Sequence, residues 1–278
     1  MKSLYHILRG CFVVIYCMFL TLFTACSNAT IPQPTPTPKP TTTPTPTPTP
    51  PLPPPRLLQH IRSSNSGSTN TVSFPNTVQK GDVILVAITQ FERKVSSTGV
   101  VDNTKNTYKM IDSAVAHPDT GQDYAELYIA QNVTGGATQI VVSFGEPSDS
   151  DGGDTNVGIY EFSGLSAASP LGDHASDTSN MGLDSTPTIR RVLNTSGMVV
   201  CFAVATDSGL QDNQQATNNA IFPGKGYELP SSDDAVLDAG NQERYYAEYA
   251  IVGAGGCMPN FTIGYPSYWA IIGVALNS

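Results

Sequence analysis

The sequence predicts an all-β domain, an antiparallel and jelly-roll-like sandwich of two sheets that follows a disordered linker rich in Pro and Thr. Three observations predict this fold. Short apolar runs rich in β-branched residues alternate with turns rich in Gly, Asn and Asp. The sequence shows no capped helical segment of useful length. About 14 such strands favour a jelly roll over a single immunoglobulin-like unit, which needs only about 100 residues.

We expect three parts in the 278-residue chain: a signal peptide over 1–25, a lipidated cysteine and spacer over 26–55, and the sandwich domain over 56–278. Lys2 and Arg9 form a basic start, and residues 11–23 form an apolar stretch too short to span a membrane comfortably. This pattern is typical of an export signal.

The residues Thr24-Ala25-Cys26 after the apolar stretch resemble the lipobox of bacterial lipoproteins, although Phe23 stands where Leu is usual. The resemblance implies that the Cys26 thiol receives a diacylglycerol and becomes the new N-terminus. The protein would then be exported and anchored by lipid to the cell membrane, on its extracellular face. An ordinary cleaved signal peptide and an uncleaved N-terminal anchor are the alternatives.

Residues 32–55 are nearly all Pro and Thr. Such a segment lacks apolar side chains for a core, and proline removes backbone donors. Extended as polyproline II at about 3.1 Å per residue, it reaches about 75 Å. We therefore expect a semi-rigid spacer that holds the domain away from a surface, with a tail of no function as the alternative.

The charge of the chain excludes some partners. The formal net charge is −9, and removal of the signal takes away Lys2 and Arg9 but no acid, which leaves 12 basic against 23 acidic side chains and a charge of −11. Nucleic acid and anionic membrane surfaces are polyanions, so neither is an expected partner.

Two cysteines fall within the domain, Cys201 and Cys257. An exported chain with two such cysteines is able to bridge them. Cys201 lies in an apolar run, however, where a small buried thiol packs equally well. Both interpretations stay open.

The predicted strands follow in chain order. Two near-continuous apolar runs, 82–91 and 197–206, predict central strands covered on both faces. Trp269 is expected to pack on the same face as Ile271 and Ala275. The other predicted strands are 57–63, 71–74, 100–103, 106–111, 124–130, 138–144, 156–163, 186–192, 244–252, 260–264 and 268–276. The alternative architecture is two smaller sandwiches divided near 164–185.

Five motifs in this order give the domain a resemblance to β-sandwich domains of bacterial secreted and surface proteins. They are Gly81-Asp82-Val-Ile-Leu-Val-Ala, Asp102-Asn-Thr-Lys-Asn106-Thr-Tyr108, Leu127-Tyr-Ile-Ala-Gln-Asn132-Val-Thr-Gly135-Gly136, Tyr160-Glu161-Phe-Ser-Gly164 and Trp269-Ala-Ile-Ile-Gly-Val-Ala-Leu. The resemblance implies an adhesive or carbohydrate-associated sandwich without a settled activity.

An acidic loop predicts a metal site. Ca²⁺ prefers several hard oxygens from a flexible loop. Asp149, Asp151, Asp154 and Asn156 are candidates to supply them, although the spacing is not that of an EF-hand. Ca²⁺ is the one cofactor that the sequence suggests. A solvated turn is the alternative, because Asp and Gly are good turn residues.

Tyrosines and carboxylates share the predicted outer face of two strands, opposite an apolar stripe. We expect these side chains to form a sugar-binding face, with rings that stack on the sugar and carboxylates that accept from its hydroxyls. The alternative is that tyrosines decorate an outer face because β-propensity favours them there. The candidates are Tyr124, Glu126, Tyr128, Tyr246 and Glu248.

Catalysis finds little support in the sequence, which has neither a Gly-x-Ser-x-Gly nor a His-Glu-x-x-His motif. A glycosidase needs two carboxylates about 5–10 Å apart, for which Glu126, Glu161 and Glu248 are candidates if they converge. We expect a surface-anchored lipoprotein for binding or adhesion, with polysaccharide the favoured ligand or an envelope component as partner. A polysaccharide-active enzyme and a structural envelope component are the alternatives.

Overall fold

Antiparallel β-strands build the domain in the computed structural model, which describes residues 53–91, 95–116, 123–145, 155–179, 182–195, 197–207, 221–231, 235–237 and 244–278. Pro50–Ser278 forms one compact unit. Within the described ranges the regular elements are strands, and the predicted all-β sandwich is confirmed. No helix in these ranges has the length and apolarity needed to cross a bilayer.

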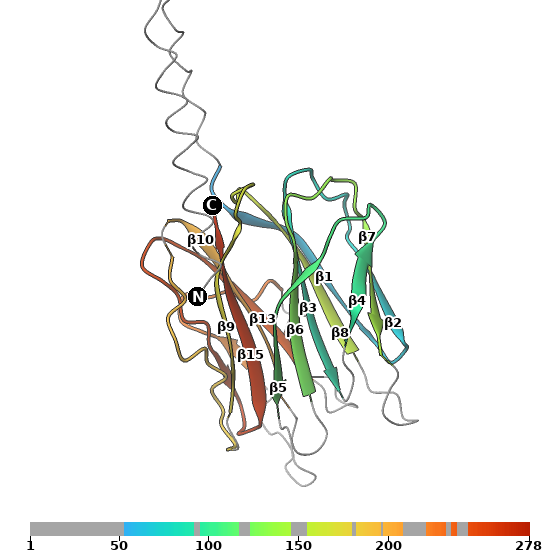
Figure 1. Cartoon of the computed structure of the whole chain (residues 1–278). Coiled ribbons are helices and arrows are strands. Elements are labelled where there is room, and N and C mark those ends of the chain that lie inside the picture. The colour runs from blue at the N-terminus through green and yellow to red at the C-terminus, as the bar shows by residue number, and fades with distance from the viewer. Residues whose placement is uncertain are drawn as a thin grey trace, which may run out of the picture. The chain divides into compact units, whose positions relative to one another are not determined.

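Two five-stranded sheets form the centre of the domain (Figure 1). The first main sheet has the order β1 (Arg56–Asn65), β8 (Thr155–Ser163), β3 (Val83–Phe91), β6 (Asp123–Ala130) and β5 (Lys109–Ala116). The second main sheet has the order β9 (Leu171–Thr178), β15 (Trp269–Asn277), β10 (Val199–Asp207), β13 (Arg244–Val252) and β12 (Ala235–Leu237). Each sheet therefore comes from one half of the chain.

Smaller groups of strands cover the outer face of each main sheet. The outer sheet, on the right of Figure 1, consists of β2 (Thr69–Ser73), β7 (Gln139–Phe144) and β4 (Val95–Asp102) and packs on the first main sheet. A short pair, β11 (Ile221–Pro223) and β14 (Phe261–Ile263), covers the second main sheet together with the segment 184–193. The domain is thus a stack of four layers.

Three apolar cores separate these four layers. The central core lies between the main sheets and contains residues such as Leu85, Phe162 and Phe202. The first outer core lies under the outer sheet, and the second outer core lies under the short pair. Strands β3, β10 and β15 therefore bury both faces, which explains their near-continuous apolar sequences.

The predicted strands agree with the observed ones over most of the chain, but several regions differ. β5 begins and ends later than the predicted strand 106–111, and the short strands β11 and β12 were not predicted. The predicted strand 186–192 forms isolated bridges, such as Thr188 with Asn260, rather than a continuous ladder. The edge strand β9 was not predicted, because its sequence Leu-Gly-Asp-His-Ala-Ser-Asp-Thr lacks the apolar alternation of a half-buried strand. The alternative of two sandwiches is right in that each half forms its own main sheet and outer layer. The two halves share the central core, however, and therefore form one unit.

The chain joins the domain at a fixed point before β1. Gly164 has φ +73°, and a Cβ on it would lie 2.6 Å from the carbonyl oxygen of Pro54 and 2.7 Å from that of Pro53. Only glycine allows this close approach. The end of β15 lies near the same point, because the amide of Ser166 donates to the carbonyl of Asn277.

Candidate functional sites

The predicted sugar-binding face lies inside the domain. Tyr128, Tyr246, Glu126 and Glu248 are buried, and Tyr124 keeps only part of its surface exposed. The predicted alternation itself is present, since Ala125, Leu127 and Ile129 face the central core. The opposite face is covered as well, by the outer layers, so the prediction of an exposed sugar-binding face at these residues is wrong.

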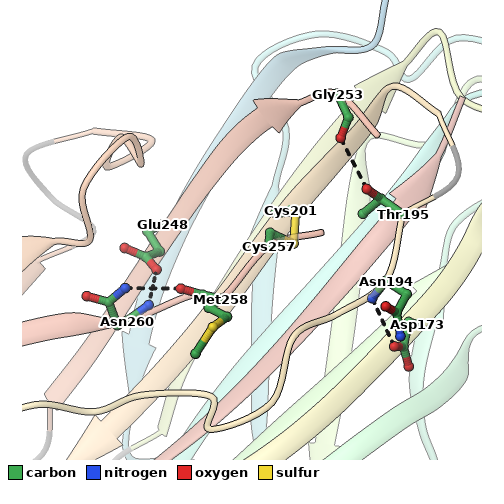
Figure 2. Close-up of a disulfide and its surroundings, with 9 residues drawn as sticks. All are labelled: Asp173, Asn194, Thr195, Cys201, Glu248, Gly253, Cys257, Met258 and Asn260. Carbon is green, nitrogen blue, oxygen red and sulfur yellow. Dashed lines mark hydrogen bonds between the residues drawn. A yellow bond between two sulfur atoms is a disulfide. The ribbon is translucent and has the colours of Figure 1, made fainter. Parts of the chain in front are cut away.

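Glu248, on β13 of the second main sheet, instead holds the short pair in place on that sheet. Its carboxylate accepts a hydrogen bond from the backbone amide of Gly224 at 2.7 Å. It also accepts one from the backbone amide of Asn260 at 2.8 Å (Figure 2). Burial raises the pKa of Glu248 to about 8, although the two amide donors act in the opposite direction. This carboxyl therefore connects β13 to the segments beside β11 and β14 by hydrogen bonds.

The two domain cysteines form a disulfide. Cys201 on β10 is bonded to Cys257 just before β14, with their Cα atoms 6.5 Å apart (Figure 2). Both lie in the second outer core. The bridge joins the second main sheet to its covering layer and decides between the two interpretations that the sequence left open.

The predicted calcium site falls mostly outside the described residues, as does the predicted lipid site Cys26. Asp149, Asp151 and Asp154 belong to that part, whereas Asn156 is described and buried. The amide oxygen of Asn156 accepts from the Arg62 guanidinium at 2.7 Å. No group of three or more His, Cys, Asp or Glu side chains suited to a metal occurs in the described ranges, and Ca²⁺ stays a prediction for the acidic loop.

The three candidate glutamates do not converge. Ile88 pairs with Glu126 and Ile84 with Glu161, so these two lie four residues apart along β3, about 13 Å at the usual rise per residue. Glu248 lies on the other main sheet. Paired-carboxylate hydrolysis by these residues would need separations of about 5–10 Å.

A carboxyl pair that the sequence did not predict lies near the start of β1. Glu161 accepts from the side chain of Gln59 at 2.5 Å and from the backbone amide of Gln79 at 2.8 Å. Burial, and then the hydrogen bond and negative charge of Glu161, raise the pKa of Asp82 to about 7, while Arg56 opposes the shift. Two carboxyls in hydrogen-bond contact are too close for a glycosidase pair.

Polar side chains from both main sheets meet at the side of the domain formed by β1. The hydroxyls of Tyr160 and Tyr245 hydrogen-bond across the central core. Gly158 makes this possible, because a Cβ there would lie 2.0 Å from the Tyr245 hydroxyl. We call this cluster the tyrosine seam; it consists of His60, Arg62, Asn156, Tyr160 and Tyr245.

Two members of the tyrosine seam reach the surface. The ring of His60 stacks on Tyr160 with centroids 5.9 Å apart, and the Arg62 guanidinium lies 5.8 Å from the centroid of Tyr245. Both are only partly buried, because β1 is an edge strand. The seam therefore presents a cation and an imidazole fixed against a rigid aromatic base, which suits binding through hydrogen bonds. The sequence did not predict this site; the alternation of His60 and Arg62 along β1 is the one signal in the sequence that could have indicated it.

Comparison with known proteins identifies no relative: no protein-family model, no curated protein and no solved structure matches this chain.

Proposed function

We propose that the protein is a surface-anchored lipoprotein whose sandwich domain binds polysaccharide. The lipobox-like Cys26 and the Pro/Thr segment supply the anchor and the spacer in this proposal. The fixed position of Pro53 and Pro54 on Gly164 supports it, since the spacer then joins a defined point of the domain. The proposed place is the extracellular face of the cell membrane, where a disulfide is stable.

We also propose that the first half is jelly-roll-like. Its strands β1, β3, β6 and β8 belong to the first main sheet, whereas β2, β4 and β7 belong to the outer sheet. The chain thus crosses repeatedly between two antiparallel sheets, as in double-sheet jelly rolls. This fold is common among lectin domains, which is an analogy of fold rather than of site.

The tyrosine seam is the proposed ligand site, and the observation that carries the proposal is the pair of partly exposed side chains held on buried tyrosines. Arg62 keeps guanidinium donors beyond the one that Asn156 accepts, because guanidinium has five N–H groups. A hydroxyl-rich polymer offers the acceptors that such donors need. Preorganised side chains also lose little conformational entropy on binding.

Binding by the full-length protein to insoluble polysaccharides and to a glycan array tests the proposal. We expect saturable binding that Arg62→Ala weakens about tenfold, since a hydrogen bond to a charged group contributes about 1.5 kcal/mol or more. Arg191→Ala is the matched control, because Arg191 is also partly exposed but pairs with Asp173 on another face. Absence of binding to every glycan would overturn the carbohydrate function, and release of reducing ends would show an enzyme instead.

Metabolic labelling with an alkyne fatty acid tests the anchor separately. We expect the wild-type protein to carry the label and to fractionate with membranes. Cys26→Ser should lose the label and leave the membrane fraction. Labelled protein with Ser at position 26 would contradict the lipoprotein assignment.

A further inference from the structure

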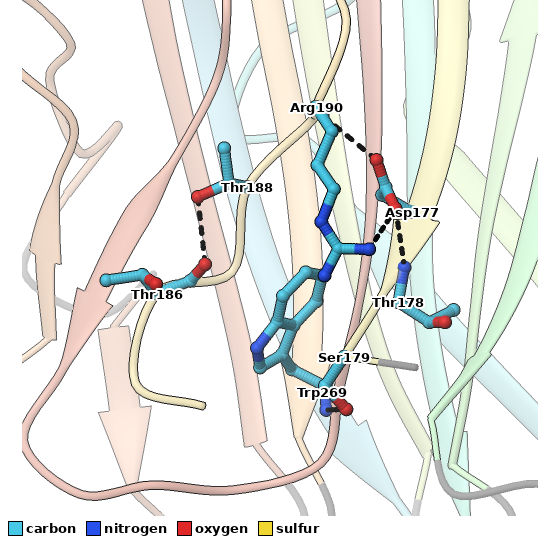
Figure 3. A network of polar contacts seen from close by, with 7 residues as sticks. All are labelled: Asp177, Thr178, Ser179, Thr186, Thr188, Arg190 and Trp269. Carbon is cyan, nitrogen blue, oxygen red and sulfur yellow. Dashed lines mark hydrogen bonds and ion pairs between the residues drawn. The ribbon is translucent and has the colours of Figure 1, made fainter. Parts of the chain in front are cut away.

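Trp269 is the only tryptophan of the chain, and an arginine covers it. The side chain packs in the second outer core with Ile271 and Ala275, as the sequence predicted, and is only 1 % exposed. The Arg190 guanidinium lies over its ring, 5.4 Å from the centroid (Figure 3). One face of the indole is therefore covered by the guanidinium of a partly exposed side chain.

The attachment of Arg190 allows that side chain to move. Its guanidinium pairs with Asp177 at 3.1 Å, yet the Arg190 side chain is 45 % exposed and that of Asp177 22 %. Water screens ion pairs of this kind, so they contribute little to stability. The backbone amide of Arg190 also donates to Asp177, at 2.9 Å, which keeps the segment in place when the guanidinium leaves the ring.

The indole nitrogen provides a second, independent observation. Nε1 of Trp269 is buried and has no hydrogen-bond partner in the part of the chain that the structure describes. A buried donor without a partner is unfavourable, and in native proteins it needs an explanation. In Figure 3 the nitrogen edge of the ring points toward the segment of Thr186 and Thr188, whose hydroxyls donate to other oxygens and do not accept from it.

We propose that Trp269 is a saccharide contact that Arg190 covers in the free protein. A neutral sugar ring takes the position of the guanidinium over the face of the indole, and a hydroxyl of an adjoining sugar unit that reaches the ring edge accepts from Nε1–H. Arg190 stays paired with Asp177 at the rim of the site. The ligand class rests on the proposed polysaccharide-binding function, whereas the covering of Trp269 does not. A polymer long enough to reach both the tyrosine seam and Trp269 would gain avidity.

Fluorescence of the full-length protein tests this directly, because Trp269 is the chain's single tryptophan. Acrylamide should quench the wild type weakly. Arg190→Ala should raise the quenching constant at least about twofold and shift the emission to longer wavelength, because it uncovers the ring. Asp177→Asn, which frees Arg190 without removing it, should act in the same direction with a smaller change. Arg191→Ala is the control and should leave quenching unchanged, since Arg191 pairs with Asp173 instead.

Soluble oligosaccharides of glucose, N-acetylglucosamine and xylose then serve as probes. An active oligosaccharide should restore protection from acrylamide in Arg190→Ala and should bind that variant more tightly than the wild type. Wild-type quenching in Arg190→Ala overturns the covering role of Arg190. Binding in pull-down without any change in Trp269 emission overturns the contact but leaves the proposed function standing. Absence of binding to all saccharides overturns both.

Discussion

The two halves of the domain arrange their main sheets alike but close their outer faces differently. The strand order β1-β8-β3-β6-β5 in the first half corresponds to β9-β15-β10-β13-β12 in the second. The outer sheet of the first half includes a continuous ladder of five pairs between β2 and β7. The short pair of the second half has three pairs, and isolated bridges extend it. Where the ladder is short, the disulfide and Glu248 attach the covering layer instead.

The tripeptide Tyr-Ala-Glu occurs in two corresponding strands, and its glutamate accepts hydrogen bonds from different groups in the two halves. Tyr-Ala-Glu ends at Glu126 in β6 and at Glu248 in β13, and both glutamates are buried beneath the outer layers. Glu126 accepts from the hydroxyl of Tyr128 at 3.3 Å, on its own strand. Glu248 accepts from two backbone amides of the covering layer. In the second half the Glu248 carboxylate therefore helps to hold the covering layer, whereas in the first half the outer layer is held together by strand pairing.

Loss of the disulfide is the largest expected effect, because the bridge attaches the covering layer of the second half. The cysteines are 56 residues apart in sequence, and a loop of this length contributes about 4 kcal/mol in the chain-entropy model. The double variant Cys201→Ala and Cys257→Ala should lose about that much unfolding free energy in urea titrations. Hydrogen exchange should rise in β11 and β14 but not in β2 and β7. An equal rise in both outer layers would contradict the role assigned to the bridge.

Gly158→Ala tests the junction between the halves. The new Cβ would meet the hydroxyls of Tyr245 and Tyr160, so we expect a loss of about 1–3 kcal/mol, as for overpacked cores. Tyr245→Phe in the same chain removes one hydroxyl and should recover part of the loss. Gly197→Ala is the control, because nothing lies within 4 Å of its added Cβ. Equal destabilisation by both glycine substitutions would refute the steric explanation.

The pH dependence of stability separates the contributions of the two halves. Asp82 in the first half and Glu248 in the second have folded-state pKa values of about 7 and about 8, above those of ordinary carboxyls. The folded state thus holds protons that the unfolded state releases, so the unfolding free energy should fall as pH rises from 5 through 8. We expect a loss on the order of a few kcal/mol, most of it from the buried Glu248, because solvent screens the partly exposed Asp82.

Two amide variants assign this pH dependence to its sources. Urea titrations at a series of pH values give the unfolding free energy as a function of pH. Asp82→Asn should remove the part of its decrease that ends near pH 7, and Glu248→Gln the part that ends near pH 8. A profile that neither variant changes would show that other groups titrate there.

The smallest effect is expected for the ion pair of Arg191 and Asp173, which joins the covering layer to β9 at the surface. The guanidinium hydrogen bond holds the pKa of Asp173 near 2. Arg191→Ala should raise that pKa toward the ordinary range in an NMR titration. The urea midpoint should stay nearly unchanged, because both side chains are partly exposed and water screens the pair. A midpoint shift as large as that of the disulfide variant would show that this surface pair attaches the covering layer as strongly as the bridge does.

The sequence predicted the strands that bury both faces but not the layers that cover them. β3, β10 and β15 are apolar over most of their length, so their central positions follow from composition. β6 and β13 alternate, which in a two-layer sandwich indicates one exposed face. In this domain segments distant in sequence cover that face, and Tyr128 and Tyr246 become buried. β9 is a polar edge strand without a local signal.

The candidate sites depended on contacts that no local pattern contains. Tyr245 faces the central core, but its hydroxyl partner Tyr160 is 85 residues away in sequence. The pairing of Cys201 with Cys257 likewise required the distance between β10 and the segment before β14. Glu161 was recognised as a candidate, whereas its partner Asp82 lies on a different segment and was not.

The attachment of the predicted spacer to β1 also determines how the domain would respond to mechanical load. A pull along the chain toward residue 53 acts at Arg56, where β1 begins, and β1 pairs with β8 from Arg56 to Asn65. If the pulling direction follows the strand, the whole ladder is loaded in shear at once rather than unzipped one pair after another. Such a geometry resists detachment of β1 under flow, and the seam residues His60 and Arg62 sit within the loaded segment.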